Sequence, residues 1–390
     1  MPSTSTTQFT YDDNSGVIQK RVITDYITLI DPADAPFVEA MGGLDGGAKK
    51  FRFVNFPHTK VEWIEDTRET LSVGLNTAMN TTVTSCVLLP ANAFQVQIGQ
   101  ILQFATSDEQ MWVSAVDSLG TTLTVTRNYG YTVNPSPSTT GASQAVIGNE
   151  AIEILGIARL EGAESHGLGY TVRSTNHNHT QIMQREVKVS RSQNQISQYG
   201  IREEFDYQSN KAIPHLMRLV EKGVYNGIRS AGSSAAPRSF GGLGTFVTNN
   251  TVNSGSAAVT QAKFENALKA AYLDGGKPSK AFVSPTNMQV IKNFYDSANF
   301  LRVDTKEKSV GMTIEKIITP YGTVDLIMDR WAPDSTIYIL DPEHVGFVTY
   351  YPFTSEPLAK TGDYVRGEVV GEFTLCVRMD KAHAVITTIA

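Results

Sequence analysis

Two small groups of side chains have the types and spacing that chemistry could use. The first is the pair His177 and His179 in the stretch Asn-His-Asn-His. Residues two apart share one face of a β-strand, so the two imidazoles could together bind a metal ion such as zinc. No cysteine and no cluster of carboxylates adjoins them in the sequence. The pattern therefore favours a polar loop over a metal site.

The second group is the three acids Glu62, Glu65 and Asp66 in the stretch Val-Glu-Trp-Ile-Glu-Asp. A pair of carboxylates can serve as acid and as nucleophile or base in glycoside hydrolysis. Adjacent charges on an extended segment, without a surrounding aromatic pocket, are more often solvated or paired with a neighbour. We therefore interpret these acids as surface charges rather than as a catalytic pair.

Motifs with a defined catalytic mechanism are missing from the sequence. It contains no Gly-x-Ser-x-Gly, no Walker phosphate-binding loop and no Gly-x-Gly-x-x-Gly. The run Gly-Gly-Leu-Gly at 241–244 lacks a preceding strand and a following helix, which predicts a flexible turn. The sequence thus predicts no catalytic, cofactor-binding or metal-binding residues, and a protein that is not an enzyme.

Composition limits the class of protein. With 390 residues, the chain is long enough for two or three domains with cores of their own. Its 41% hydrophobic and 18% charged residues are typical of a globular protein, and its net charge of −6 argues against a general nucleic-acid binder. That charge is compatible with a shell that only encloses nucleic acid. The two cysteines, Cys86 and Cys376, form no disulfide or zinc pattern and indicate a reducing compartment.

Neither a signal peptide nor a membrane-spanning helix is predicted. The polar N-terminus lacks a basic region followed by an apolar run. No uninterrupted apolar stretch reaches the roughly 18 residues that a transmembrane helix needs. We expect a soluble protein that is made in the cytoplasm.

A long amphipathic helix within residues 202–230 is the element around which the rest of the chain is expected to be organised. Apolar and small residues recur there every three or four positions and form one helix face. They are Leu216, Leu219, Val220, Gly223, Val224, Gly227 and Ile228. The opposite face would carry Arg218, Glu221, Lys222 and Asn226.

Three residues of this helix carry further expectations. Gly223 and Gly227 would let another backbone come close to the buried side, at a cost of roughly 1 kcal/mol of helix propensity each. Pro214 leaves two alternatives open, because proline disfavours helix at the residue before it. Either the helix starts near Pro214, or a longer helix from about Glu203 is kinked there.

Residues 82–150 are predicted to form a small β-barrel or sandwich. Short alternating runs are separated there by turn signals about every ten residues. The candidate core residues are Val96, Ile98, Ile101, Leu102, Trp112, Val113, Val116, Leu123 and Val125.

The segments on either side of this module read as the two arms of one hairpin. The outgoing arm has strands at 51–56 and 60–65, and the returning arm includes 171–173 and 184–190. An isolated two-stranded ribbon is marginal in water. The arms are therefore expected to lie on another domain or on another molecule.

The remaining segments predict a compact α/β unit and a strand-rich C-terminus. Caps, turn residues and apolar periodicity define the elements. They are a short helix at 31–43, a loop at 231–256, a helix capped by Thr260 and ended by Gly275 and Gly276, a strand at 281–284, a helix from Pro285, strands at 323–328, 336–340 and 344–350, and a closing hairpin over 368–390 with its turn at 379–382.

Several segments resemble one protein family in their order and spacing. In the N-terminal half these are 31–37, 61–67, the module 99–125 with the run Leu-Thr-Val-Thr-Arg at 123–127, and 179–190. In the C-terminal half they are 208–227, 285–294, 319–331 and 356–386. Together they resemble the major capsid proteins of tailed bacteriophages, of the Hong Kong 97-type fold, in the branch with a β-rich insertion in its extended loop. The resemblance covers nearly the whole chain.

The resemblance implies an α+β fold with named parts. These are an N-terminal arm (1–50), an extended loop (51–190) containing a β-barrel or sandwich insertion domain (82–150), a peripheral domain with the long spine helix (191–234 and 351–390) and an axial domain (235–350). It implies self-assembly through hexamers and pentamers into the icosahedral shell that encloses the double-stranded DNA of a tailed phage. Assembly would take place in the cytoplasm of the bacterial host. A portal protein, and separate scaffolding and decoration proteins, would be partners; no membrane would be involved.

Charged residues are the candidate contacts between subunits. On the loop they are Glu62, Glu65, Asp66, Arg68, Arg185, Glu186 and Lys188. Nearer the C-terminus they are Lys360, Asp363, Arg366 and Glu372. For each, the alternative is a solvated surface charge worth about 0–1 kcal/mol. Two other functions stay open: an encapsulin-like compartment shell on the same fold, and a β-rich phage tail or adhesion binding protein.

Overall fold

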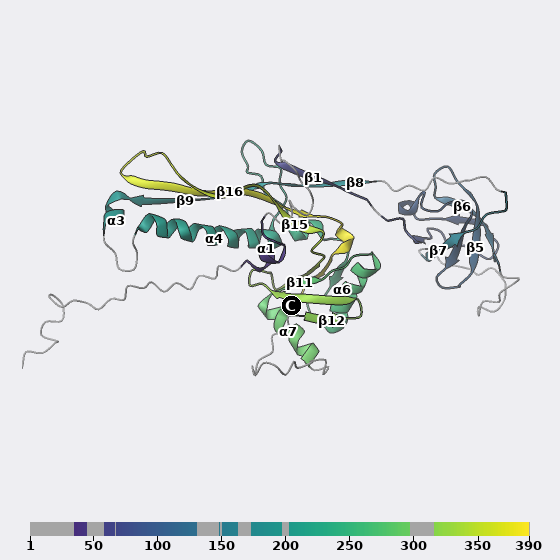
Figure 1. The fold of residues 1–390 in the computed structure, drawn as a ribbon. Coiled ribbons are helices and arrows are strands. Elements are labelled where there is room, and N and C mark those ends of the chain that lie inside the picture. The colour runs from purple at the N-terminus through teal and green to yellow at the C-terminus, as the bar shows by residue number, and fades with distance from the viewer. Residues whose placement is uncertain are drawn as a thin grey trace, which may run out of the picture. The chain divides into compact units, whose positions relative to one another are not determined.

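The chain forms two compact units, which the computed structural model describes over residues 35–44, 58–66, 68–130, 148, 150–162, 173–196, 203–296 and 316–389 (Figure 1). We call Met1–Trp63 with Asn176–Ala390 the main unit, and Ile64–Thr175 the β unit. The predicted strand at 51–56 lies outside the described residues. No helix in the described part of the chain is both long and apolar enough to cross a membrane.

The predicted long helix is confirmed as α4, which spans Glu204–Asn226. It runs through Pro214, so the longer of the two alternatives holds. Glu204 and Asp206 lie in its first turn, where acidic side chains stabilise the positive end of the helix dipole. The helix packs against a three-stranded antiparallel sheet in the order β15-β16-β9, beside which it runs in Figure 1. The strands are β15 (Val345–Pro357), β16 (Tyr364–Val377) and β9 (Gln181–Ser190).

One face of β9 explains why this strand belongs to the sheet rather than to a hairpin arm. Met183, Val187 and Val189 alternate along it and are buried in the core that α4 shares. Because that core is available within the same chain, β9 pairs with β16 over its whole length. The prediction that 184–190 belongs to the returning arm of the hairpin is therefore wrong.

The close backbone approach predicted at Gly227 is confirmed, whereas the missing side chain at Gly223 makes room for the Phe240 ring, 2.7 Å from its Cβ position. The partner is the turn at Phe240–Gly242, whose Gly242 N–H donates to the carbonyl of Gly227 at 2.9 Å. A Cβ atom on Gly227 would lie 2.8 Å from the carbonyl oxygen of Phe240. Gly241 and Gly242 are buried, and the short helix α5 (Leu243–Phe246) follows directly. The prediction of a flexible turn at 241–244 is thus wrong, because this run packs against α4.

A six-stranded mixed sheet forms the second half of the main unit. Its order is β10-β17-β14-β11-β13-β12, and its core includes α6 (Gln261–Leu273) and α7 (Pro285–Asp296). As predicted, the Thr260 hydroxyl caps α6 by accepting the N–H of Lys263. The strands are β10 (Thr251–Asn253), β17 (Ala384–Thr387), β14 (Ile337–Leu340), β11 (Lys280–Val283), β13 (Gly322–Met328) and β12 (Lys316–Thr319).

The predicted closing hairpin over 368–390 is wrong. The strands β16 and β17 lie in different sheets, and β17 pairs with β14 and β10. Met379 adopts a left-handed conformation (φ 55°), and the 3-10 turn η3 (Asp380–Ala382) redirects the chain. Ala384, Val385 and Ile386 are all buried, which suits a strand inside the larger sheet.

The β unit contains a six-stranded antiparallel sheet in the order β2-β7-β4-β5-β6-β3. Backbone hydrogen bonds join its two end strands, from Leu89 N to Gly74 O and from Asn76 N to Val87 O, both 2.8 Å. The sheet therefore closes into a small barrel. The strands are β2 (Ser72–Gly74), β7 (Ala151–Ile157), β4 (Gln100–Phe104), β5 (Gln110–Val116), β6 (Thr122–Arg127) and β3 (Ser85–Val87).

Most of the predicted core residues of this module are buried in the barrel. Val96, Leu102, Val113, Leu123 and Val125 are all at most 2% exposed. The sheet also takes in β2 and β7, which lie outside the expected range of 82–150. The barrel spans more of the sequence than expected, because β2 and β7, its first and last strands along the chain, pair with each other.

A two-stranded ribbon and a short helix also belong to the described chain. The strands β1 (Lys60–Glu65) and β8 (Ser174–His179) pair as a two-stranded ribbon. The five-residue helix α1 (Pro36–Ala40) buries Phe37 and Val38 in the main core, with the Phe37 ring 4.7 Å from that of Phe282.

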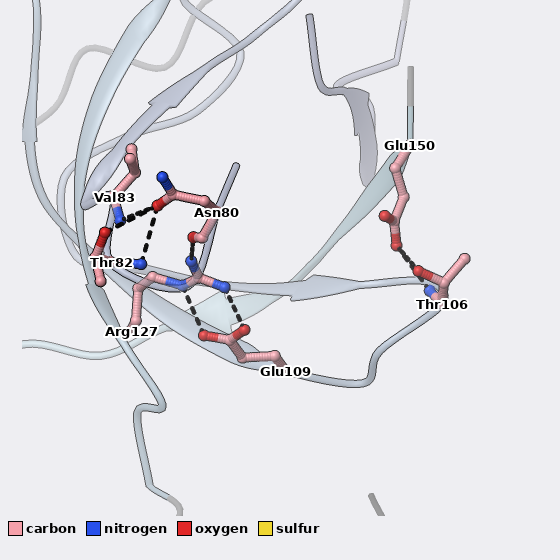
Figure 2. Close-up of polar contacts among 7 residues, drawn as sticks. All are labelled: Asn80, Thr82, Val83, Thr106, Glu109, Arg127 and Glu150. Carbon is pink, nitrogen blue, oxygen red and sulfur yellow. Dashed lines mark hydrogen bonds and ion pairs between the residues drawn. The ribbon is translucent and has the colours of Figure 1, made fainter. Parts of the chain in front are cut away.

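A buried ion pair ties the barrel together (Figure 2). Arg127 at the end of β6 donates from Nε and Nη2 to the Glu109 carboxylate, at 2.8 and 2.5 Å. The two side chains are 5% and 2% exposed. Arg127 also donates to the backbone carbonyl of Asn80, whose side chain accepts the N–H groups of Thr82 and Val83. One guanidinium thus joins the start of β5, the end of β6 and the loop before β3.

We expect Gly227→Ala to destabilise the main unit by about 1–3 kcal/mol, because the added Cβ meets backbone that cannot move aside. The backbone at Gly227 (φ −63°) suits any residue, so the effect is steric. Gly156→Ala is the control, since nothing lies within 4 Å of its Cβ position. Thermal unfolding of the unassembled chain measures the stability of the two variants. Equal melting temperatures would show that the added Cβ atom at position 227 is tolerated and would contradict the prediction.

We expect Arg127→Met to destabilise the barrel by about 3–5 kcal/mol, because it leaves Glu109 buried without its cation. Hydrogen exchange of the β5 and β6 amides reports the free energy of opening. Lys316→Met removes an exposed pair with Asp325 at 3.6 Å and should cost about 0–1 kcal/mol. An Arg127→Met barrel that exchanges as slowly as the wild type would show that the buried pair is dispensable.

Candidate functional site

The two histidines of the Asn-His-Asn-His stretch lie on the strand β8, not in the polar loop that the sequence favoured. Their rings are 5.4 Å apart and nearly perpendicular. Partial burial and the nearby Arg229 guanidinium lower the pKa of His177 below its usual value. In the described part of the chain, no group of three or more His, Cys, Asp or Glu side chains could hold a metal ion.

Asn178, between the two histidines, is the residue of this stretch that makes the most contacts to other segments. It is fully buried. Its amide nitrogen donates to the carbonyls of Leu375 (2.7 Å) and Gly241 (3.1 Å), and its oxygen accepts the N–H of Gly241 at 2.8 Å. Asn178 therefore joins the ribbon to β16 and to the turn that packs on α4. Sequence pattern could not single it out, because an asparagine in a polar stretch reads as exposed.

Glu372 is also held inside the chain. Its side chain is buried, and its carboxylate accepts a hydrogen bond from Arg238 Nη2 at 2.6 Å and another from the hydroxyl of Thr180. Arg238 Nε in turn donates to the Thr180 carbonyl at 3.0 Å. These contacts are intrachain, so Glu372 does not have the exposure that we expected of a contact between subunits.

Of the loop acids, Glu62 lies on the exposed face of the ribbon, and Asp66 follows the end of β1. Glu62 pairs with Lys60, whose hydrogen bond and charge lower the pKa of that carboxyl. Asp66 pairs with Arg173 at 3.5 Å, just beyond the last residue of β1. Glu65 is half-buried, and Arg68 is exposed. On the opposite face, Val61 and Trp63 are buried, and the Trp63 ring lies 5.7 Å from Phe246.

Candidate contact residues from the loop and from the C-terminal part of the chain lie close together on β9 and β16. Glu186 pairs with Arg366 at 2.8 Å. The Lys188 amine lies 3.8 Å from the centre of the Tyr364 ring. Asp363 pairs with Arg191 at 3.1 Å, just after β9 ends. Two candidates stand apart from these pairs: Arg185 is half-buried, and Lys360 is exposed.

A groove follows the free side of β9. Among the described strands β9 has only β16 as a neighbour, so its other edge is open. Gln181–Gln184 line one stretch of groove with the α4 residues Leu216 and Leu219. Arg185–Ser190 line the next stretch with Glu204 and Gln208. All ten residues of β9 therefore border a groove whose other wall is α4.

The helix α1 is fixed by an acid that sequence analysis assigned to the exposed face of α4. Glu221 is in fact fully buried, and its carboxyl accepts the N–H of Phe37 at 2.5 Å and of Val38 at 3.3 Å. Asp329 lies beside it and accepts the Tyr225 hydroxyl at 2.6 Å. Burial and the adjacent Asp329 raise the pKa of Glu221 to about 9. The periodicity of α4 placed Glu221 on the exposed face of the helix, because periodicity alone could not show that α1 covers this residue.

Solved structures from phages and from a GTA particle share the fold of this chain. The capsid of a native GTA particle superimposes with a TM-score of 0.55 at 8% identity, over 97% of this chain and 98% of that one. The Microbacterium phage Oxtober96 structure gives 0.51 at 12% identity, over 98% and 99%. The Mycobacterium phage Bobi structure gives 0.50 at 10% identity, over 98% and 99%. The chain therefore has the Hong Kong 97-type capsid fold, a mixed α+β architecture, as predicted.

The family model of the SU10 major capsid protein matches residues 2–390, and the chain belongs to that family. No curated protein matches the sequence. The protein is a major capsid protein, a structural component of the icosahedral phage shell, and not an enzyme. Its place is the virion capsid, where copies of the chain form a homo-oligomeric shell.

We expect Asn178→Ala to destabilise the main unit by about 2–4 kcal/mol, because the backbone groups of Gly241 and Leu375 lose their partner in a buried site. Urea unfolding of the unassembled chain measures this. Asn176→Ala is the matched control on the same strand: Asn176 is half-buried and should cost about 1 kcal/mol or less. If the two variants unfold at the same urea concentration, Asn178 is not the residue that fixes the ribbon.

Proposed function

We propose that copies of this capsid protein contact one another through two surfaces. The first is the exposed face of the β1–β8 ribbon, and the second is the open edge of β9 with its groove along α4. The open edge carries the proposal, because all ten residues of β9 border the groove and the strand has only one described neighbour.

An unpaired edge strand supports this role on physical grounds. Its free N–H and C=O groups can pair with an extended segment of another chain. Exposed apolar side chains in the groove supply area to bury: Ile182 is 52% exposed, Leu219 43% and Ile228 80%. Obligate interfaces of this kind commonly bury about 2,000 Å² or more.

The ribbon offers a second free face. Val61 and Trp63 are buried on one side, while Glu62 and Ile64 are exposed on the other. Ribbon charges that the sequence nominated lie on or beside this free face, with Glu62 and Asp66 exposed. A two-stranded ribbon gains stability when a third surface covers it.

The finer assignments belong to the same proposal. The β unit is covalently inserted between the two ribbon strands, which supports its assignment as an insertion in the extended loop. On this proposal 1–50 is the N-terminal arm, 51–180 the extended loop, 181–234 with 351–390 the peripheral domain, since β9 pairs with β16, and 235–350 the axial domain. Hexamers and pentamers then build a shell around double-stranded DNA, with a portal protein and separate scaffolding or decoration proteins as partners.

The groove is tested by Leu219→Arg combined with Ile228→Arg. Both residues are already exposed in the single chain, so folding should be unaffected while a desolvated arginine in the interface blocks assembly. We expect the yield of closed shells, measured by sedimentation and electron microscopy, to fall by about tenfold or more.

Leu273→Arg on α6 is the control, because Leu273 is 62% exposed but lies outside the groove. An unchanged yield for the groove variant, with its melting temperature unchanged, would remove the groove from the interface. Glu65→Ala combined with Asp66→Ala tests the ribbon in the same assay, and normal shell yield would remove that surface.

A further inference from the structure

We propose that the neutral side chain of His383 holds together two short connections between the sheets of the main unit, and that protonation of its ring releases them. The first connection leaves β14 after Leu340 and enters β15 at Val345. The second leaves β16 after Val377 and enters β17 at Ala384. His383 is the last residue of the second connection and is fully buried.

The ring joins the two connections through its two nitrogens. The backbone N–H of Asp341, in the first connection, donates to Nδ1 at 3.1 Å. Nε2 lies 3.0 Å from the carbonyl oxygen of Arg378, in the second connection. Because Nδ1 accepts a hydrogen bond, the proton of the neutral ring belongs on Nε2, which donates to Arg378. The Arg378 N–H also donates to the His344 carbonyl at 2.9 Å and so joins the same two connections.

A second proton on the ring would conflict with this arrangement. Nδ1 would become a donor and would face the Asp341 N–H, which is also a donor. The imidazolium would also hold its charge at a site that is not exposed to solvent. The charged ring is therefore more stable outside the site, and the hydrogen bond from Asp341 is lost when the ring leaves.

The acids around the ring do not offset the cost of burying its charge. The charges of Asp341 and Asp380 would stabilise a charged ring, whereas that of His344 would oppose it. Both carboxylates already accept hydrogen bonds, Asp341 from the N–H of Glu343 and Asp380 from the N–H of Thr248. Burial has the largest effect and lowers the pKa of His383 from 6.5 to about 4.

The remaining charged groups on the segments packed here lie on the two connections and on the turn after α6, whose Gly276 packs against Ala382. They are Glu343 on the first connection, Arg378 and Lys381 on the second, and the exposed Asp274 and Lys277 on the turn.

The lowered pKa of His383 sets the direction of the pH dependence. The ring binds a proton more weakly in the folded chain, so its contribution to stability is complete above about pH 6.5. This contribution declines as the pH falls and is lost below about pH 4. Between these limits, the population in which the two connections are open should increase by about tenfold for each pH unit of acidification.

Hydrogen exchange of the unassembled full-length chain between about pH 7.5 and about pH 5 tests the proposal. The reporters are the amides of Asp341 and Arg378, whose hydrogen bonds join the two connections. We expect their protection factors, corrected for intrinsic exchange, to fall by about thirtyfold over this range. The amides of β5 and β6 in the barrel should keep their protection.

His383→Asn removes the titration and keeps an oxygen in the place of Nδ1 to accept the Asp341 N–H. In this variant the protection of the two reporters should no longer depend on pH. His344→Gln is the matched control, because His344 lies on the first connection but its side chain is 37% exposed. This control should respond to pH as the wild type does.

Reporter protection that stays constant in the wild type over this range would overturn the proposal, and so would an equal fall in the wild type and in His383→Asn. If His383→Asn does not fold, nitrogen NMR of the wild-type histidine rings decides. The proposal requires a neutral His383 ring with its proton on Nε2 at about pH 5, and a charged ring at that pH would overturn it.

Discussion

The contact between α4 and the turn at Phe240–Gly242 is the constraint on which the main unit depends. Two backbones meet there without a side chain between them, and Gly242 donates to Gly227. The same turn exchanges two hydrogen bonds with Asn178, which also bonds to β16. The helix α4 thus holds the turn in place, and the turn holds β8, which is one of the two strands of the ribbon. Glycine is needed at this contact because a Cβ atom would push the helix and the turn apart.

Buried polar side chains connect segments of the main unit that are distant in sequence. Asn178 and Glu372 each bind partners more than sixty residues away, with good hydrogen-bond geometry. A buried polar group that keeps all its partners costs little and specifies one arrangement. The Glu221 carboxyl likewise joins α4 to α1, whose Phe37 and Val38 N–H groups it accepts.

Local pattern was enough to predict the elements whose stability is local. The period of α4, the Thr260 cap and the alternation in the barrel all follow from neighbouring residues. What pattern could not predict was partner choice. β9 and β17 have strand-like sequences, yet their neighbours β16 and β14 are chosen by cores assembled from the whole chain. Glu221 and Asn178 were missed for the same reason, since polar residues become buried only when a distant segment satisfies them.

The candidate contact charges illustrate how folding changes the meaning of a surface residue. Glu186, Arg366, Lys188 and Asp363 were nominated because charges suit contacts between subunits, but in one chain they already bind one another or near neighbours. An ion pair satisfied within the subunit has less to gain from a second partner, and exposed pairs contribute little in any case. The edge of β9 is different, because its backbone groups have no described strand beside them and the adjoining groove exposes apolar side chains. In the proposed interface, association would draw its free energy from that edge and groove, and the charges would set the register along the strand.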